Sequence, residues 1–428
     1  MYIYRARVFD TPTNPFTGGQ LRSETDIALV VDDGKIIART DIGTATTAHP
    51  DAEVIDLRDG ILIPGLIDTH VHYPQIRAIG HLGKPLLEWL NECALPEEEK
   101  LVDDAYARNV ADEFLTGLIG SGTTSAMVFG AHFASAVDIL FARAAELGLR
   151  MTTGLVTSDR NLPEPLLTTV DRSLSESQQL IDRWHGQSRL RYAVTPRFSL
   201  SAGPELLAAG GQLVRDNPGI SVTSHLNENH DEIAGVAQVH PQAQDYLDTY
   251  DKAGLLDRNT ILAHNVHPND RELARMAETG AAAAHCPTSN SALASGFFPL
   301  RRHIEAGVKV ALGTDVGAGN GFSMFKEGVQ AYFMQQLDPN GGQPLTSAHL
   351  LHLATKAGAQ ALDLDDKVGD LSEGKRFDAV LVRPTTGQPL DVGISNAADD
   401  EDALAKLFAM GTPADITGVW IDGQRVKT

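Results

Sequence analysis

The stretch that decides the fold is residues 66–72, LIDTHVH, an apolar strand-like run that ends in two histidines. Seven more apolar runs follow it, and amphipathic stretches such as residues 136–149, AVDILFARAAELGL, separate them. Apolar strands that alternate with helices are typical of a parallel sheet covered on both faces. Eight such units predict an α/β fold, a closed (β/α)8 TIM barrel. The eight runs are residues 66–72, 123–129, 150–158, 190–198, 221–228, 260–266, 281–290 and 309–317.

Both ends of the chain predict a second, smaller β domain. They consist of short runs that are apolar or alternate in polarity, which is typical of strands. Asp32-Asp33-Gly34 and Asp422-Gly423 have the composition of hairpin turns. We therefore expect a β-sandwich domain from residues 1–63 and 368–428, and a barrel domain from residues 64–367. The strand-like runs are residues 1–9, 26–39, 53–57, 378–384 and 416–426.

The composition limits the partners and the compartment. The 428 residues carry 35 Lys and Arg against 56 Asp and Glu, a formal net charge of −21. Such a charge repels phosphate backbones and anionic membrane surfaces, so we expect a small-molecule substrate and neither nucleic acid nor membrane as a partner. No run of about 18 apolar residues occurs, and the start, MYIYRARVFD, lacks the apolar core of a signal peptide. The two distant cysteines, Cys93 and Cys286, exclude a disulfide framework and favour a cytoplasmic protein.

Two segments interrupt the barrel pattern. Residues 73–100 are expected to form a long loop after the first strand, and loops of this length are usually lids or binding elements. Residues 396–404, NAADDEDAL, are acidic and are expected on the surface.

Ionisable residues stand at the predicted ends of the barrel strands, where barrel enzymes place their chemistry. His70 and His72 are two residues apart, so both imidazoles point to one face of the first strand. His225 lies near the end of the fifth run and Asp315 near the end of the eighth. Three imidazoles and a carboxylate that leave one position open are typical of a catalytic zinc or iron site. The alternatives are core histidines and, for Asp315, a helix N-cap.

Further polar residues lie beside this set. Glu228 follows His225 by three residues, which suits a general acid/base in the loop above the metal, although it could instead cap the next helix. His264 lies near the end of the sixth run and is a spare imidazole. Asp68 lies on the same strand face as His70 and could orient a histidine.

Several motifs together resemble one family. PGLIDTHVH, SHLNEN, LAHNV, AHCPTSN and LGTDVG are similar to motifs of the amidohydrolase superfamily, in its single-metal deaminase branch. HVHYPQ, LLEWLN, TPRFSLS and HCPTSN followed by SALASGFFPL are similar to the guanine deaminases within that branch. The resemblance spans nearly the whole chain. It implies a metal-dependent hydrolysis of guanine to xanthine and ammonia, and a homodimer.

The resemblance also implies roles for individual residues. His70, His72, His225 and Asp315 match the metal ligands, and Glu228 matches the residue that moves protons. His264 matches the histidine that polarises the attacking water and is not counted as a ligand. No lysine occurs between Lys100 and Lys252, so the fourth strand cannot supply the bridging lysine of the two-metal hydrolases on this scaffold. One divalent metal ion is therefore expected, with zinc preferred and iron possible.

For the substrate, Gln75, Arg197 and Phe198 match the family's purine-binding residues. Arginine can donate a fork of hydrogen bonds to the acceptor edge of guanine, and phenylalanine can stack on the ring. Trp89 and Leu87, in the long loop, are candidates to cap the purine. The alternatives are a surface salt bridge for Arg197, core packing for Phe198, and lid packing or a dimer contact for Trp89 and Leu87.

Two other functions stay open at this stage. Related single-metal enzymes act on cytosine, adenosine derivatives, 8-oxoguanine or aminotriazines, and Gln75 with Arg197 and Phe198 favours guanine among these. A barrel that has lost its metal ligands and serves in assembly is disfavoured, because every ligand position and Glu228 is filled.

Overall fold

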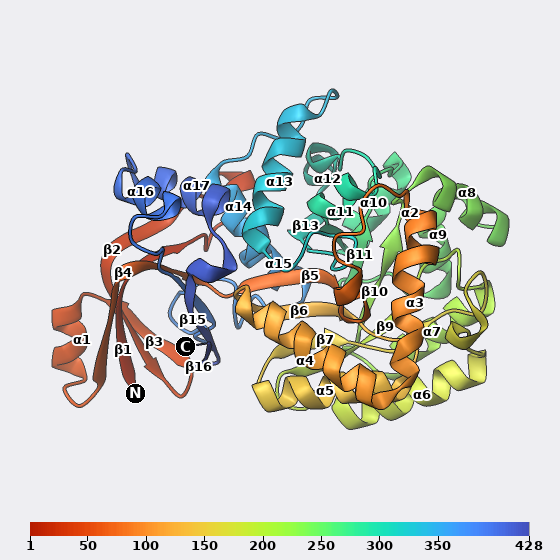
Figure 1. Cartoon of the computed structure of the whole chain (residues 1–428), viewed down its shortest axis with the longest axis horizontal. Coiled ribbons are helices and arrows are strands. Elements are labelled where there is room, and N and C mark those ends of the chain that lie inside the picture. Colours follow the sequence, from red (N-terminus) through yellow and green to blue (C-terminus); the bar gives the residue numbers. More distant parts are fainter. Residues whose placement is uncertain (428) are drawn as a thin grey trace.

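The structure, a computed structural model, describes residues 1–427 and has two parts, a barrel and a terminal sheet (Figure 1). In the barrel, every pair of neighbouring strands is parallel, in the order β5-β6-β7-β9-β10-β11-β12-β13, with β8 beside β9. The predicted (β/α)8 architecture is therefore confirmed. The barrel strands are β5 Leu66–His72, β6 Thr123–Phe129, β7 Arg150–Thr153, β8 Val156–Thr157, β9 Leu190–Pro196, β10 Ser221–Leu226, β11 Thr260–His264, β12 Ala282–His285 and β13 Lys309–Leu312.

Hydrogen bonds between β5 and the chain around the end of β13 close the barrel. The Thr69 hydroxyl donates to the Leu312 carbonyl at 2.8 Å. The Asp315 amide donates to the His70 carbonyl at 2.8 Å, and the His72 amide donates to the Val316 carbonyl at 2.8 Å. The first and the last strand are thereby held together at the end where the histidines lie.

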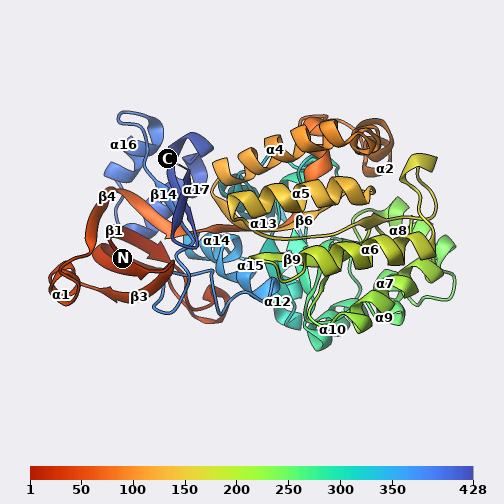
Figure 2. The same cartoon turned by 90° about the horizontal axis from the view of Figure 1, so that it is seen from below.

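Helices cover the outside of the barrel, as Figure 2 shows from below. The 14-residue helix α5, Ala134–Leu147, begins and ends two residues before the amphipathic stretch predicted at 136–149. None of the described helices is long and apolar enough to cross a membrane. The helices that follow the barrel strands are α4 Asp104–Gly120, α5 Ala134–Leu147, α6 Val170–Trp184, α7 Pro204–Asp216, α8 His230–Val239, α9 Tyr246–Ala253, α10 Asp270–Thr279, α11 Pro287–Ala292, α12 Leu300–Ala306, α13 Met324–Leu337, α14 Ser347–Ala354 and α15 Lys356–Ala361.

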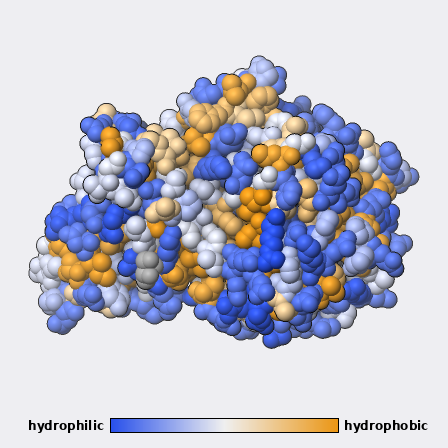
Figure 3. Space-filling view, in the orientation of Figure 1, coloured by the Kyte–Doolittle hydropathy of each residue, from blue (hydrophilic) through white to orange (hydrophobic). Residues whose placement is uncertain are grey.

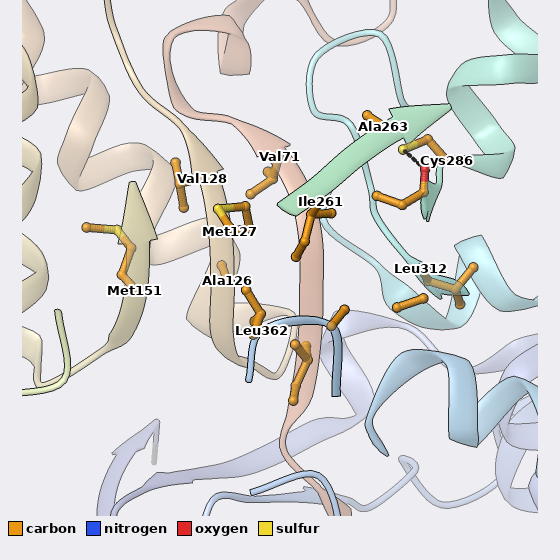
Figure 4. Packing of buried hydrophobic residues seen from close by; sticks show 14 of the residues in the cluster. Val71, Ala126, Met127, Val128, Met151, Ile261, Ala263, Cys286, Leu312 and Leu362 are labelled. Atoms are coloured by element: carbon orange, nitrogen blue, oxygen red, sulfur yellow. Dashed lines mark hydrogen bonds between the residues drawn. The ribbon is translucent and has the colours of Figure 1, made fainter. Parts of the chain in front are cut away.

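The barrel strands are buried on both faces. Ala126, Met127 and Val128 are consecutive on β6, point alternately to the two faces, and are each at most 1% exposed (Figure 4). Cys286, just after β12, is buried in the same cluster and donates to the Ala284 carbonyl at 3.5 Å (Figure 4). Burial raises the pKa of its thiol well above the ordinary value, which fits a small core residue.

Several strands end earlier than predicted, because the backbone turns sharply at their carboxyl ends. Asn227, His264 and Asp315 adopt φ angles of 49°, 71° and 48°. Residues other than glycine rarely adopt this left-handed conformation, which ends a strand. The run 281–290 was predicted as one strand, but β12 ends at His285 and α11 begins at Pro287, whose ring suits the first turn of a helix.

The third run, 150–158, is split into β7 and β8 by Gly154. A Cβ atom on Gly154 would lie 1.8 Å from the Ala193 carbonyl oxygen, so only glycine permits this close approach to β9.

Residues 73–100 are not the loop that we expected. They form the 3₁₀ helix η2 (Tyr73–Ala78), the helix α2 (Leu86–Trp89), one turn of π-helix η3 (Leu90–Ala94) and the helix α3 (Leu95–Glu99). Each element is too short to show a helical period in the sequence. Their apolar side chains form a separate buried cluster with Phe198 and Leu293, which we call the lid cluster: Ala78, Leu86, Trp89, Leu90, Cys93, Ala94, Phe198, Leu293 and Ala318.

Both ends of the chain form the second part, on the left of Figure 1. Within residues 1–427 it is a seven-stranded sheet in the order β16-β15-β14-β4-β1-β2-β3. The predicted turns are present, with positive φ at both Asp33 and Gly34. Its strands are β1 Tyr2–Asp10, β2 Arg22–Asp32, β3 Lys35–Thr40, β4 Glu53–Pro64, β14 Ala379–Val382, β15 Ile416–Ile421 and β16 Gln424–Lys427.

This sheet curls over its own core. Tyr4 on β1 and Trp420 on β15 are three strands apart, a separation of roughly 14 Å in a flat sheet, yet their ring centroids are 5.8 Å apart. The terminal part also carries α1 (Ile42–Ala48), α16 (Pro389–Ser395) and α17 (Asp400–Met410). Residues 396–404 include the first turn of α17, where Asp399 and Glu401 are exposed but Leu404 is buried.

We propose a domain boundary at residues 63/64, one residue before the end of β4 at Pro64; β4 belongs to the terminal sheet and β5 to the barrel, with only Gly65 between them. The second boundary, at 367/368, falls between α15, which packs on the barrel strand β13, and β14.

Candidate active site

A cavity lies at the carboxyl ends of the barrel strands, with about 370 Å³ of empty space that includes its opening to solvent. Residues from the strand ends form its floor and residues of the lid cluster form its wall. The lining residues are His72, Gln75, Leu86, Trp89, Leu90, Arg197, Phe198, His225, Glu228, His264, Leu293, Asp315 and Ala318.

Four of the predicted residues converge beside this cavity. The Nε2 atom of His72 lies 3.0 Å from Nε2 of His70, 3.2 Å from Nε2 of His225 and 3.2 Å from Oδ1 of Asp315. His70 Nε2 lies 3.3 Å from the same Asp315 oxygen. Ligand atoms at about 2.0–2.1 Å around a tetrahedral cation are about 3.3 Å apart, so the spacing of these four side chains fits one metal ion.

Hydrogen bonds on the far side of the rings orient this cluster. The Nδ1 atom of His225 lies 2.6 Å from the Arg197 carbonyl oxygen, which directs its Nε2 to the cluster. The buried Asp68 carboxylate accepts from the His70 amide, and from the amide and hydroxyl of Thr314 at 3.0 and 2.5 Å. Burial raises the pKa of Asp68 to about 7. Asp68 thus holds the backbone beside His70 and Asp315 and does not contact an imidazole.

The electrostatics of the cluster suit cation binding. Burial lowers the pKa of His72 to about 4, and burial together with the neighbouring histidines lowers the pKa of His225 well below its ordinary value. Burial raises the pKa of Asp315, but the hydrogen bonds from His70 and His72 outweigh it and the net shift is downward. Neutral imidazoles and an ionised carboxylate are the forms that bind metal.

His264 stands slightly apart from the other donors. Its Nε2 is 3.8 Å from Asp315 Oδ2 and 3.5 Å from Glu228 Oε2. Ligand atoms of His70, His225, His264 and Asp315 all lie within 4.8 Å of one another, so His264 could replace His72 in a ligand set. The shorter contacts of His72 favour His72.

Glu228 lies in the loop after β10 with its side chain beside His264. Its Oε1 accepts from the Ser295 hydroxyl at 3.3 Å. Burial raises the pKa of Glu228 well above its ordinary value, and nearby Asp315 raises it further. Neither capping alternative applies, because Asn229 is the N-cap of α8 and Ser323 is the N-cap of α13.

Arg197 and Gln75 line the cavity and share one partner, Glu98. The Arg197 Nη1 donates to both oxygens of Glu98 at 2.8 and 2.6 Å, and Gln75 Nε2 donates to Glu98 at 2.8 Å. Arg197 is 2% exposed, so it is not part of a surface salt bridge.

Of the three apolar residues predicted to contact the purine, two line the cavity and one does not. Phe198 and Trp89 line the cavity and belong to the lid cluster. Leu87 does not line the cavity, whereas Leu86 and Leu90 do; Leu87 is half-buried against the lid cluster. In this short helix a register error of one residue moves a side chain to another face.

Three residues near the site were not singled out from the sequence. Glu98 lies in the charged run PEEEK, which reads as solvated surface. Asn290 accepts from Nδ1 of His264 at 3.0 Å and so directs its Nε2 to the cavity, and Ser295 contacts Glu228. Asn290 and Ser295 lie within the motifs that carried the resemblance, but only the fold shows their partners.

The comparisons with known proteins agree with this arrangement. A sequence profile described as "Amidohydrolase family" matches residues 61–426. A probable guanine deaminase of Deinococcus radiodurans is 55% identical, over 99% of this chain and 98% of the relative. The solved E. coli guanine deaminase superposes with a TM-score of 0.95 at 37% identity, over 99% of both chains. A guanine deaminase of C. acetobutylicum, solved with guanine in its active site, gives a TM-score of 0.91 at 29% identity, also over 99% of both chains.

The chain therefore belongs to the amidohydrolase family, as the motifs, the barrel and the histidine–aspartate cluster indicate. The relatives that match it over nearly its full length include guanine deaminases.

Proposed function

We propose that this protein hydrolyses guanine to xanthine and ammonia. The observation that carries the proposal is that one cavity brings together the histidine–aspartate cluster, Glu228, and the pair Arg197 and Phe198. These are the parts that a hydrolytic deaminase of a purine base needs: a site for an activated water, a residue that moves protons, and groups that hold the ring.

We propose His70, His72, His225 and Asp315 as the ligands of one divalent cation. Zinc is our first choice, and iron also suits three imidazoles with a carboxylate. A cation held by these residues supplies a water whose pKa is near 7, and hence a nucleophile at neutral pH. The direction of His264 Nε2 toward Asp315 and Glu228 supports a role in orienting that water.

Glu228 is the proposed general acid and base. Its raised pKa keeps a proton on the carboxyl group, which it donates to N3 of guanine, and C2 becomes electrophilic. The water oxygen adds to C2, and one water proton passes to Glu228. Glu228 then protonates the amino group, the C2–N bond breaks and ammonia leaves. The proton of the remaining C2 hydroxyl returns to Glu228 as the C2 carbonyl forms. The products together contain every atom of guanine and one water.

The ring is held by residues on the lid side of the cavity. We propose that Arg197 donates to O6 and N7, and that Phe198 and Trp89 contact the ring faces. The Gln75 carbonyl oxygen accepts from the Gly317 amide at 3.3 Å and has a second lone pair, with which it can accept from an N–H of the purine.

A substrate panel tests this proposal. Ammonia release is measured with guanine, 8-oxoguanine, cytosine and an aminotriazine as substrates of the metal-loaded protein. Guanine is expected to have the highest kcat/KM. A higher kcat/KM for cytosine or the aminotriazine would refute the guanine assignment and favour another deaminase on the same scaffold.

We also propose that the protein is a cytoplasmic homodimer. Cys93 and Cys286 are both free and buried, which suits a reducing compartment. The face in Figure 3 is mostly hydrophilic, but apolar residues gather over α13, where Phe333 is 51% and Leu337 68% exposed. Sedimentation of the wild type and of Phe333→Glu/Leu337→Glu tests this interface; a monomeric wild type would refute the homodimer.

A further inference from the structure

Glu98 is a buried carboxylate behind the cavity and holds two of its lining residues at once. It lies on α3, is 3% exposed, and accepts from Arg197 and from Gln75. His132 also lies close, with Nε2 3.3 Å from Glu98 Oε2. None of these three partners is a proposed metal ligand.

The pairing with Arg197 is one-sided. Arginine commonly meets a carboxylate with two nitrogens as a fork. Here a single nitrogen, Nη1, donates to both oxygens of Glu98. Since the other guanidinium nitrogens, Nε and Nη2, have no side-chain partner in residues 1–427, their N–H groups are left for a ligand in the cavity.

Gln75 is fixed in the same way. Its Nε2 donates to Glu98 at 2.8 Å, and its Oε1 accepts from Gly317. Reversing the amide would place oxygen against the Glu98 carboxylate and nitrogen against a backbone N–H. Nε2 also lies 3.3 Å from Nδ1 of His72, so Glu98 and His72 together determine which end of Gln75 carries the free acceptor.

The charge on Glu98 is maintained in this buried place. Burial raises its pKa, but the positive charge of Arg197 and the contact with His132 outweigh burial, and the net shift is downward. The ionised Glu98 neutralises Arg197, so that the cavity presents N–H donors without an excess positive charge. Such a site favours a neutral carbonyl acceptor over an anion.

We propose that Glu98 is a positioning residue that sets selectivity for guanine, by holding Arg197 toward O6 and N7 and Gln75 in one orientation. This inference rests on the proposed function, because it assumes that both side chains contact the purine. It adds a determinant of selectivity that lies outside the substrate contacts.

The test compares guanine with 2-aminopurine, which carries the same C2 amino group but has no O6. In the full-length, metal-loaded protein, Glu98→Gln is expected to lower kcat/KM for guanine by about 10- to 100-fold, mainly through KM. The loss for 2-aminopurine should be smaller than the loss for guanine by at least about threefold, because 2-aminopurine keeps N7 and the Gln75 contact but makes no O6 contact. Metal content should stay unchanged. The matched control is Glu99→Gln, on the same helix but outside the cavity.

A double-mutant cycle with Arg197→Ala gives a second readout. If Glu98 acts through Arg197, Glu98→Gln should have little further effect on guanine in the Arg197→Ala background. Should Glu98→Gln fail to fold, Glu98→Asp is the second variant. It keeps the negative charge, but its shorter side chain moves the carboxylate away from Arg197 and Gln75, and the same loss of selectivity is expected.

The possible results distinguish a failure of the role proposed for Glu98 from a failure of the proposed function. An equal loss for both substrates, or no loss for guanine, would overturn the role of Glu98 while the proposed function stands. A wild type that releases no ammonia from guanine would overturn the proposed function and this inference with it.

Discussion

Glu228→Gln tests the proton transfers most directly. Glutamine has the shape of glutamate, and its oxygen can still accept from the Ser295 hydroxyl, which lies 3.3 Å from Glu228 Oε1. The substitution therefore keeps the cavity but removes the proton. General acid–base catalysis contributes about 10²- to 10⁴-fold to a rate. Since Glu228 serves both N3 and the leaving amino group, we expect the upper part of this range, a loss of about 10³- to 10⁴-fold in kcat.

This loss corresponds to about 4–5 kcal/mol in the activation free energy. The assay is ammonia release by metal-loaded protein with guanine, together with metal analysis of both proteins. Metal content should be the same in the variant and the wild type, because Glu228 is not a proposed ligand. Asp231→Asn, an exposed residue in the first turn of α8, is the control. A variant that keeps more than about a tenth of the wild-type kcat would refute the role assigned to Glu228.

Three further predictions concern stability and the metal. The buried Asp378 accepts from Arg150 Nε and Nη2, both at 3.3 Å. Arg150→Met leaves this carboxylate buried without its charged partner, so it should lower the free energy of unfolding, measured in urea, by about 3 kcal/mol. A loss below about 1 kcal/mol would contradict this prediction. Burial and Glu228 raise the pKa of Glu232 from 4.5 to about 7. Between these two pH values the unfolded chain has lost the proton that the folded protein keeps, which favours unfolding. The free energy of unfolding of the wild type should therefore fall relative to that of Glu232→Gln as the pH rises from about 4.5 to 7. A pH-independent difference between these two proteins would show that the shift is absent. Removal of metal by a chelator should abolish ammonia release and lower Tm, and added zinc or iron should restore both; full activity of protein shown to be metal-free would contradict the proposed site.

Most barrel strands could be predicted because a strand covered on both faces is apolar at every position, as Ala126, Met127 and Val128 illustrate. The strand ends could not, because a polar residue such as Asp315 or His264 in left-handed backbone looks the same in a sequence as one that continues the strand. The lid helices were missed because four or five residues are too few to show a helical period.

Some residues of the candidate site could likewise be predicted from the sequence, and others could not. His70, His72, His225 and Asp315 could be predicted to converge because parallel strands bring their carboxyl ends to one rim. Glu98 could not be predicted as part of the site, because its role depends on contact with Arg197, which is 99 residues away in the sequence. A buried carboxylate in the run PEEEK cannot be told from its exposed neighbours until its partner is known.

The hydrogen bonds that close the barrel also have a consequence for how the protein is made. They join β5 to the segment after β13, so His70 and Asp315 meet only when residues 245 positions apart are paired. A nascent chain on the ribosome that has not yet reached Asp315 lacks the carboxylate and the strand that fix His70 and His72. A cation bound by the proposed ligands would therefore be captured in its final geometry only late in synthesis, after the first and last strands of the barrel have paired.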